Sequence, residues 1–573
     1  MKLLKLKIQD HDGFRSLQQG FEINFHSLSD KEAMEDFRPF CFAGLNGSGK
    51  SNVLEALSSI FYHMEVCVAR YLPESIKNID NFKRNKCFPD AFTLEYLIGQ
   101  ENDSDYVVEN FHKVSIIKKE GGEPKMEIQE YPFSDLTEKI EISLYASKSG
   151  KQSAPGKAFL PDQVIGYSSG ENEILSLPFI KSRLIHLDEF KQASKDNYEN
   201  FEKTENSLIY IDSNMSQAVL LTCLLFESDE TLKPLRDIDN TGILGLKSFR
   251  ININLLDFEF KDNVTGKSYL VPINKILENY QLDILKKCST MWYSDGNTLW
   301  LDFYVDKGTQ EAFKYHFKYN SFKCFQMFSL LYELNSHFVD DRTKENIYQS
   351  KGVYTDWKLP VASPGHDVFH FLDFYILKEM KKTGEIKELL LRSFSDGEHQ
   401  FLHTMGICLL LKDKRSILLL DEPETHFNPS WRAKFVKILN ESITLGNSGN
   451  PSSTLNVHLL KDVLLTSHSP FIISDCLPDN VILFEKDSDG KTLARKASEL
   501  GIDTYGTSVN LISNRIFKSK ETIGKYALSK LYGYRDKFQS ARNKDEVINE
   551  LNEEFGDSIE KLLLIKEMTD NNA

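Results

Sequence analysis

The sequence predicts an α/β fold, in which a mixed sheet flanked by helices carries a large inserted α+β module and a helical C-terminal tail. Three observations predict it. A buried run at residues 40–43 enters a glycine-rich turn and then a helix. A second apolar run, at 416–420, leads into two carboxylates. Between these segments, residues 190–360 carry the turn signals of antiparallel hairpins.

The composition is that of a folded, soluble chain. Its 573 residues are 41% hydrophobic and 27% charged, which excludes a disordered or collagen-like protein. No apolar stretch reaches the roughly eighteen residues of a transmembrane helix, so we expect no membrane partner. The alternating start, Met1–Lys7, does not resemble a secretion signal. Eight scattered cysteines without a Cys-x-x-Cys pair favour free thiols and a cytoplasmic protein. The net charge of -15 argues against general coating of nucleic acid.

The N-terminal region reads as strands with one helix. We expect these segments to be strands: 3–8, 21–25, 40–43, 92–98 and 106–118. The helix begins at residues 52–57, directly after the glycine-rich turn. A buried strand, a tight turn and a helix in this order place the turn at the end of a sheet.

Residues 190–360 differ from the N-terminal region, because they carry the signals of antiparallel hairpins. Residues 258–260 and 268–271 flank a turn at 263–266, which predicts a hairpin. The run 299–305 predicts a strand, and the alternating aromatic and basic residues at 313–319 predict another. That second strand would be half-buried, or would offer a surface for single-stranded nucleic acid. A helix is expected at 217–226, and no heptad array indicates long coiled-coil arms.

The segment GLNGSGKS at residues 44–51 matches the full pattern of a phosphate-binding loop. Its glycines let successive backbone N–H groups turn inward at a helix N-terminus and form a site for anions. Lys50 would reach the β- and γ-phosphates of a nucleotide, and the Ser51 hydroxyl would bind Mg²⁺. The residues expected to bind the nucleotide here are Gly44, Asn46, Gly47, Ser48, Gly49, Lys50, Ser51 and Asn52.

The segment SILLLDEP at residues 416–423 predicts a buried strand with two carboxylates at its end. Asp421 would hold Mg²⁺, and Glu422 would orient and polarise the attacking water. Phosphoryl transfer mainly needs positioning and neutralisation of charge, and these groups supply both.

Two more motifs complete a pattern. SFSDGE occupies residues 393–398, and the apolar run 463–465 leads into Ser467 and His468. In this order, the four motifs resemble the Walker A, signature, Walker B and switch-histidine motifs of the ABC-class ATPase head, a P-loop NTPase. The resemblance implies that Ser395, Gly397 and Glu398 cap the γ-phosphate held by a second copy of the chain. It also implies that His468 senses the γ-phosphate, and that two heads clamp two ATP molecules.

Details indicate a subclass. Asn46, Asn52 and the segment DEPETHFNP at 421–429 are similar to RecF, Rad50 and OLD-type heads rather than to transporter subunits. Within that group, the segments at 394–400, 167–173 and 506–508 resemble the PtuA family, the ATPases of the Septu anti-phage systems. This resemblance implies a separately encoded HNH nuclease, PtuB-like, as partner. Some members also work with a retron reverse transcriptase and its DNA or RNA product.

Two alternatives stay open. One is a RecF- or Rad50-like DNA-repair ATPase, and the other is a self-contained OLD-type nuclease. An OLD-type nuclease needs an Asp-x-Asp pair, which residues 487–489 offer, although a hairpin turn explains them better. His399 and His403 could pair on a metal, but no third ligand is evident. Gln163 is a hypothesis for the glutamine of the Q-loop.

These observations divide the chain into four parts. Residues 1–189 and 361–515 would form the ATPase head, 190–360 the inserted module, and 516–573 the tail. The tail has apolar stripes at 528–538 and 547–565, which would pack onto the head or dock a partner. No His-Asn-His constellation appears in the sequence, so we expect any cutting of nucleic acid to belong to the partner.

Overall fold

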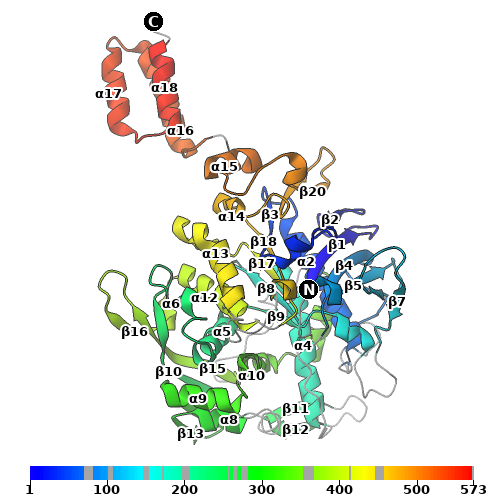
Figure 1. Cartoon of the computed structure of the whole chain (residues 1–573). Coiled ribbons are helices and arrows are strands. Elements are labelled where there is room, and N and C mark those ends of the chain that lie inside the picture. Colours follow the sequence, from blue (N-terminus) through cyan, green and yellow to red (C-terminus); the bar gives the residue numbers. More distant parts are fainter. Residues whose placement is uncertain are drawn as a thin grey trace.

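The computed structural model describes the chain except for short segments. The residues outside the description are 70–71, 73–75, 77–81, 101–106, 146–153, 171–172, 196–205, 256, 262–267, 273–281, 353–366, 412–413, 446–456, 520 and 571–573. The others form a layered head and a small helical unit that stands apart from it (Figure 1). Among them, no helix has the length and apolar character required to cross a bilayer.

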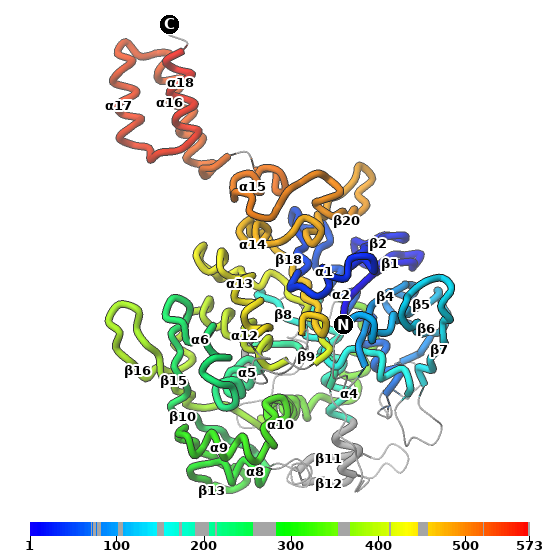
Figure 2. Tube along the Cα trace, viewed as in Figure 1, coloured from blue at the N-terminus to red at the C-terminus, as the bar shows by residue number. Residues whose placement is uncertain are grey.

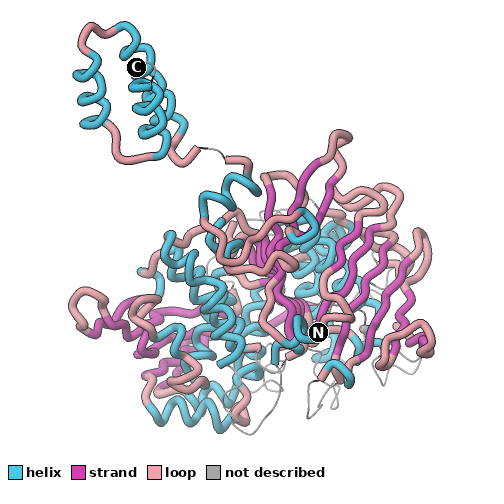
Figure 3. The backbone as a smooth tube through the Cα atoms, turned by 45° about the horizontal axis from the view of Figure 1, so that its top comes forward, coloured by secondary structure: helices cyan, strands magenta, loops and turns pink. Residues whose placement is uncertain are grey.

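A seven-stranded sheet lies at the centre of the head (Figure 3). Its order is β20-β19-β3-β18-β17-β8-β9, and all neighbours are parallel except β19 and β20. The strands are β3 (Phe40–Gly44), β8 (Gln163–Ser168), β9 (Leu208–Tyr210), β17 (Ser416–Asp421), β18 (Lys461–Thr466), β19 (Val481–Lys486) and β20 (Thr492–Lys496). Successive residues of β17 enter two different cores, Ile417 one and Leu418 the other. Because both faces are covered, residues 417–420 of the strand are all apolar.

One face is covered by α2 (Lys50–Val68), with a six-stranded antiparallel sheet sharing the same core. That sheet has the order β2-β1-β4-β5-β6-β7. Its strands are β1 (Lys2–Ile8), β2 (Glu22–Asn24), β4 (Phe92–Ile98), β5 (His112–Lys118), β6 (Lys125–Gln129) and β7 (Lys139–Ile142). The strands expected in this region are confirmed, except that β5 starts later than residue 106, after a single 3₁₀ turn at Val108–Asn110.

The other face is covered by α5 (Ser213–Phe226), α12 (Asp396–Leu410) and α13 (Pro429–Leu445). The expected helix at 217–226 is therefore confirmed within α5. α12 packs between α5 and α13, so it lies on the face opposite to α2. Segments from both ends of the sequence meet in the central sheet, since β3 pairs with β18 and β19 (Figure 2).

A five-stranded antiparallel sheet extends the core on the α12 side. Its order is β13-β14-β10-β15-β16. The strands are β10 (Ile243–Asn254), β13 (Met291–Asp295), β14 (Thr298–Tyr304), β15 (Phe369–Glu379) and β16 (Ile386–Leu390). This sheet runs past residue 360 because β15 pairs with β10 along most of its length. Within 190–360, β9 instead joins the central sheet. The division of the chain into four parts stays a prediction.

The strand expected at 313–319 is wrong. This segment lies in α9 (Lys307–His316) and the turn after it. Asp306 caps the helix by accepting a hydrogen bond from the Thr309 backbone N–H. Phe313 and Phe317 are four residues apart and buried, whereas Tyr315 is 70% exposed. The aromatic positions follow the period of a helix as well as that of a strand, and the cap decides between them.

Both expected hairpins are present. β11 (Asp257–Lys261) pairs antiparallel with β12 (Ser268–Pro272), while the expected turn at 263–266 lies outside the described residues. Residues 487–490 form the turn between β19 and β20, where the Asp487 carboxylate accepts backbone N–H groups of Asp489 and Lys491. The turn thus explains the Asp-x-Asp pair.

The tail helices α16 (Lys525–Ser540), α17 (Lys544–Glu554) and α18 (Ile559–Asp570) form a unit of their own (Figure 1). Their apolar stripes share a separate core that includes Leu531, Leu551 and Leu564. The expectation that these stripes pack onto the head is therefore wrong, because each stripe is covered by its neighbours. The apolar side chains of Leu562 and Leu563 remain more than half exposed, at 65% and 61%.

The remaining helices connect these layers. They are α1 (Lys31–Glu35), α4 (Glu173–Lys195), α6 (Lys233–Arg236), α8 (Leu282–Cys288), α10 (Ser321–Glu333), α11 (Asp341–Gln349), α14 (Pro470–Ser474) and α15 (Val509–Phe517). A parallel sheet with a glycine-rich loop leading into α2, flanked by helices, confirms the predicted fold class. It is an α/β P-loop head with further sheets and helices.

Candidate nucleotide site

The predicted motifs meet at one edge of the central sheet, where its parallel strands end. In the strand register, Asp421 lies opposite Thr466 on one side and Ser168 on the other. Thr466 lies opposite Phe42, two residues before the end of β3. The carboxyl ends of parallel strands form the usual ligand edge of such sheets.

The loop after β3 has the backbone of an anion site. Gly44, Gly47 and Gly49 have positive φ values of 148°, 74° and 104°. A Cβ at Gly44 would lie 2.3 Å from the Phe484 carbonyl oxygen, and one at Gly49 would lie 2.6 Å from Ser16 Oγ. Glycine is therefore required both by conformation and by space. The loop ends at Lys50, where α2 begins and presents its free N–H groups.

Lys50 is buried beneath this loop. Its Nζ donates hydrogen bonds to the carbonyl oxygens of Gly44 and Leu45, each at 3.1 Å. Burial lowers the pKa of Lys50, while the nearby carboxylates of Glu422 and Asp421 oppose that shift. The ammonium thus contacts the carbonyl oxygens of the phosphate-binding loop and is stabilised by the charge of the two carboxylates.

Asp421 joins two segments of the site. Its Oδ1 accepts a hydrogen bond from Ser51 Oγ at 2.7 Å and another from Thr466 Oγ1 at 2.7 Å. Asp421 is only 5% exposed. A carboxylate and a serine hydroxyl at this separation can share one hard cation, because Mg²⁺ prefers oxygen ligands.

Glu422 has a strained backbone, with φ at 48°. Its N–H donates to Thr466 Oγ1 at 2.9 Å, and its carbonyl oxygen accepts from Thr425 Oγ1 at 3.0 Å. Strain of this kind persists only where neighbours hold it in place. The turn leaves the Glu422 side chain 43% exposed, with Oε1 3.4 Å from His468 Nε2.

The surroundings of His468 favour its neutral form. Burial and, after it, the charge of Lys50 lower the pKa of His468, while Glu422 acts in the opposite direction. A neutral imidazole can donate one hydrogen bond and accept another. His468 also packs against Phe517 at the end of α15, with 5.9 Å between the ring centroids.

The residues present fit a nucleotide and Mg²⁺. Three glycines open the loop, α2 starts where a phosphate would bind, and Ser51 and Asp421 form an oxygen pair. The Ser48 hydroxyl is buried, with no hydrogen-bond partner among the described residues, which is unusual for such a group. Asn46 is exposed at the tip of the loop, and Asn52 is half-buried in the first turn of α2.

The signature segment forms a capped helix start. Ser395 is the N-cap of α12 and makes a capping box with Glu398. Glu398 also forms an ion pair with Lys378 of β15, and together these contacts lower its pKa against the effect of burial. At Gly397 a Cβ would lie 2.9 Å from the His426 carbonyl oxygen. The helix N-terminus thus abuts the segment that follows Glu422.

The Gln163 hypothesis is wrong. Gln163 lies at the start of β8, opposite Ser416 at the start of β17, so it lies at the far edge of the sheet. Ser168 and Ser169 occupy the expected place beside Asp421 instead, and Ser169 Oγ donates to Thr425 Oγ1 at 2.8 Å. Residues 171–172 of the same segment lie outside the described part.

Two side chains of the site were missed at the level of sequence. Thr466, the last residue of β18, bonds to both Asp421 and Glu422. Glu424, two residues after Glu422, is buried and accepts a hydrogen bond from Ser467. A hydroxyl at the end of a buried strand could have indicated Thr466. Nothing in the local pattern indicated that Glu424 faces the interior.

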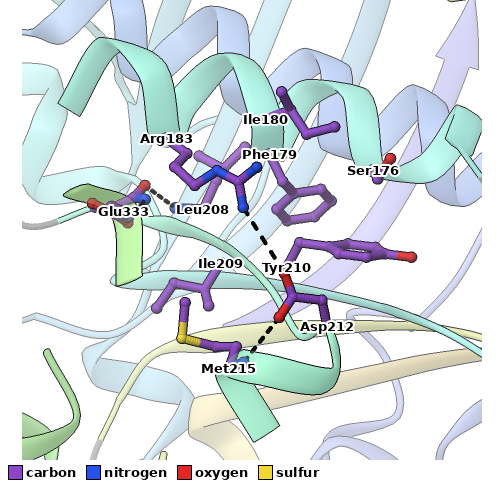
Figure 4. Close-up of a pocket in the computed structure, with 11 residues that line it drawn as sticks. Ser176, Phe179, Ile180, Arg183, Leu208, Ile209, Tyr210, Asp212, Met215 and Glu333 are labelled. Carbon is purple, nitrogen blue, oxygen red and sulfur yellow. Dashed lines mark hydrogen bonds and ion pairs between the residues drawn. The ribbon is translucent and has the colours of Figure 1, made fainter. Parts of the chain in front are cut away.

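Other candidates lie elsewhere. His399 and His403 are neighbours on α12, with 5.9 Å between ring centroids, and burial lowers the pKa of His403 to about 3. Across the described ranges, no group of three or more possible metal ligands is assembled. A cavity of about 60 Å³ lies beside β9, where Arg183 faces Asp212 (Figure 4). That volume suits water molecules rather than a nucleotide.

One family model matches part of the chain. Residues 329–474 match the family model described as "AAA domain, putative AbiEii toxin, Type IV TA system". None of the curated proteins matches the chain. The matched part contains the signature segment, both carboxylates and His468, whereas the phosphate-binding loop lies before it.

Three solved structures are distantly similar. An Smc head bound to the C-terminal winged-helix domain of ScpA is 10% identical, with a TM-score of 0.32 over 87% of this chain and 99% of its own. An Smc head with an extended coiled coil, bound to the C-terminal domain of ScpA derived from Pyrococcus furiosus, is 11% identical. Its TM-score is 0.29 over 87% of this chain and 98% of its own. RecF bound to ATP is 12% identical, with a TM-score of 0.29 over 86% of this chain and 97% of its own. Likenesses at these scores are too distant to support statements about this chain.

The fold and the site define the class of protein. The chain is a P-loop α/β head, in which the loop at 44–51 and the carboxylates Asp421 and Glu422 lie at one sheet edge.

Proposed function

We propose that this chain binds ATP with Mg²⁺ and hydrolyses it, and that hydrolysis acts as a switch. The observation that carries the proposal is the convergence at the sheet edge. Ser51 bonds to Asp421 at 2.7 Å, and Glu422 lies 3.4 Å from His468. These four side chains supply the cation ligands, the water-orienting carboxylate and a neutral hydrogen-bonding imidazole that the reaction requires.

Each residue has a defined task in this proposal. The loop N–H groups and Lys50 hold the phosphates and neutralise their charge. Ser51 and Asp421 would bind Mg²⁺, which supplies further neutralisation of the charge that develops in phosphoryl transfer. Glu422 orients the attacking water, and its strained backbone keeps the carboxylate at the open edge of the site. His468 contacts Glu422 and is placed to contact the γ-phosphate.

A second copy of the chain completes each site. α2 and α12 pack on opposite faces of the central sheet, so the phosphate-binding loop and the signature segment belong to different layers of one head. Ser395 and Asp396 are exposed at the start of α12, where its N–H groups can face a partner's nucleotide. The pair of heads would therefore close only with nucleotide between them.

We further propose a role in anti-phage defence, in which the ATPase holds and controls a separately encoded HNH nuclease. The resemblance of residues 394–400, 167–173 and 506–508 to the PtuA family supports this role. The description of the matched family as a toxin-type AAA domain is compatible with defence. A retron reverse transcriptase and its nucleic acid would be an additional partner.

Where the neighbouring reading frame encodes an HNH protein, co-expression of the two chains tests this role. We expect the two chains to purify together and to lower phage plating, and we expect Glu422→Gln to abolish protection. Tight ATP-dependent DNA binding without an HNH partner would favour the DNA-repair alternative. Cutting of DNA by the purified chain alone with Mg²⁺ or Mn²⁺ would favour the OLD-type nuclease.

A further inference from the structure

Glu424 is a buried carboxyl group beside the proposed reaction site. It lies two residues after Glu422 and is only 4% exposed. Its Oε1 accepts a hydrogen bond from Ser467 Oγ, and its Oε2 is buried, with no hydrogen-bond partner in the described part of the chain. Burial raises the pKa of Glu424 to about 7, and the charge of Glu422 adds to that effect. A buried carboxyl with one unpaired oxygen is costly to fold, so a stabilising role alone explains it poorly.

The partner of Glu424 lies directly before the switch histidine. Ser467 Oγ, which donates to Glu424, also accepts a hydrogen bond from the Ser469 N–H at 2.9 Å. The Ser467 N–H donates to the Phe42 carbonyl oxygen at 3.0 Å, which ties the same residue to β3. The backbone is therefore fixed on both sides of His468, and Ser467 makes all three contacts, two through its hydroxyl and one through its N–H.

Two short segments carry the proposed catalytic pair. Glu422 belongs to the turn 422–425, which Thr466 and Thr425 hold by hydrogen bonds. His468 belongs to the segment 467–469. The Glu424–Ser467 hydrogen bond joins these two segments, and Glu422 Oε1 of one lies 3.4 Å from His468 Nε2 of the other.

We propose that Glu424 is a positioning residue for hydrolysis, and that through Ser467 it holds His468 in register with Glu422. The inference rests on the proposed ATPase function. Glu424 does not touch the nucleotide in this account. It sets the distance and direction between two groups that do, and a misplacement of about 1 Å at such groups can lower a rate by about a hundredfold.

The test is a double-mutant cycle of Glu424→Ala and Ser467→Ala, with Glu424→Gln as the conservative variant. The amide oxygen of Gln can still accept the Ser467 hydrogen bond. Tyr96→Phe is the matched control, because it removes a buried hydroxyl that donates to the Phe159 carbonyl oxygen in the six-stranded sheet. For each variant, kcat, KM, the Kd of a non-hydrolysable ATP analogue and Tm are measured.

We expect Glu424→Ala and Ser467→Ala each to lower kcat by about tenfold or more, with KM and Kd changed less than about twofold. The double variant should be no slower than the single variants, because one contact is removed in each. Glu424→Gln should stay within about twofold of the wild type, and Tyr96→Phe should lower Tm without a comparable loss of kcat.

Other outcomes overturn the inference. If the loss of kcat in the double variant equals the product of the two single losses, the two residues act independently. A loss of kcat in Tyr96→Phe equal to that in Glu424→Ala would show a general effect of stability. If Glu424→Gln is as slow as Glu424→Ala, loss of the hydrogen bond to Ser467 does not explain the lower kcat. If the wild-type chain itself hydrolyses no ATP, the proposed function fails first, and the inference fails with it.

Discussion

Ser51 donates a hydrogen bond to Asp421 across 370 positions of sequence, with 2.7 Å between Oγ and Oδ1. The bond joins the first turn of α2 to the end of β17, so the two motifs form one oxygen pair. Removal of the hydroxyl should therefore weaken Mg²⁺ binding more than nucleotide binding.

Ser51→Ala tests that relationship. We expect the Mg²⁺ concentration for half-maximal ATPase activity to rise by about tenfold, because one of two protein oxygen ligands is lost. The affinity for ATP without Mg²⁺ should change by less than about twofold, since the loop N–H groups and Lys50 remain. An unchanged Mg²⁺ requirement would contradict the assignment of Ser51 as a ligand.

Glu422→Gln should separate binding from hydrolysis. The amide cannot polarise the attacking water, so we expect single-turnover hydrolysis to slow by about a hundredfold or more. Retention of ATP should be unchanged or longer. Lys50→Ala should instead lose ATP binding, and Glu553→Gln, which changes an exposed carboxylate of α17, is the control. Wild-type turnover by Glu422→Gln would show that another group orients the water.

The ion pair between Lys378 and Glu398 should control how the signature segment of one copy pairs with a second copy. Glu398 lies in the first turn of α12, and Lys378 neutralises it from β15. Lys378→Met would leave the negative charge of Glu398 uncompensated in the segment that we propose meets the γ-phosphate held by a second copy, so ATP-dependent pairing should weaken by about tenfold. Lys378→Met combined with Glu398→Gln should restore pairing, as light scattering would measure. Failure of the double variant to recover would mean that Lys378 acts by packing.

The stability of the head should depend on pH through Glu424. Burial raises its pKa to about 7, whereas an unfolded Glu has a pKa near 4.3. The native state therefore holds this proton more tightly, and the contribution to stability is complete below about pH 4.3 and is lost as the pH rises through about 7. The charge of Glu422 raises the pKa of Glu424 further, whereas the charge of Arg432 lowers it.

Denaturant unfolding of the wild type and Glu424→Gln from pH 4 to pH 8 measures this effect. The Gln side chain does not titrate. We expect the free energy of unfolding of the wild type to fall relative to the variant by about 3 kcal/mol across this range. A difference between the two proteins that is constant with pH would show that Glu424 has an ordinary pKa.

The sequence predicted those parts of the site whose chemistry is local. The glycines at 44, 47 and 49 are required by backbone geometry within a few residues, and the strand before Asp421 is marked by its own apolar run. The pairing of these motifs followed from the parallel sheet, because strand ends share an edge.

Contacts between distant segments were not predictable in the same way. Glu424 and Ser467 are 43 positions apart, and neither residue type favours burial. Gln163 looked suitable by type, but the register of β8 with β17 places it at the wrong end. The segment 313–319 fits two periods, and only the Asp306 cap selects the helix. The tail helices cover one another, a choice that apolar stripes alone leave open.

The most direct measurement of the central claim mixes two inactive copies. Lys50→Ala lacks the lysine of the phosphate-binding loop, and Ser395→Arg blocks the signature segment, so each variant alone should be inactive. In a mixed pair, one site combines the intact loop of one copy with the intact signature of the other. We expect the mixture to regain about a quarter of wild-type ATPase activity, since half of the pairs are mixed and each has one working site. No recovery on mixing, or full activity of Ser395→Arg alone, would contradict a site shared between two copies.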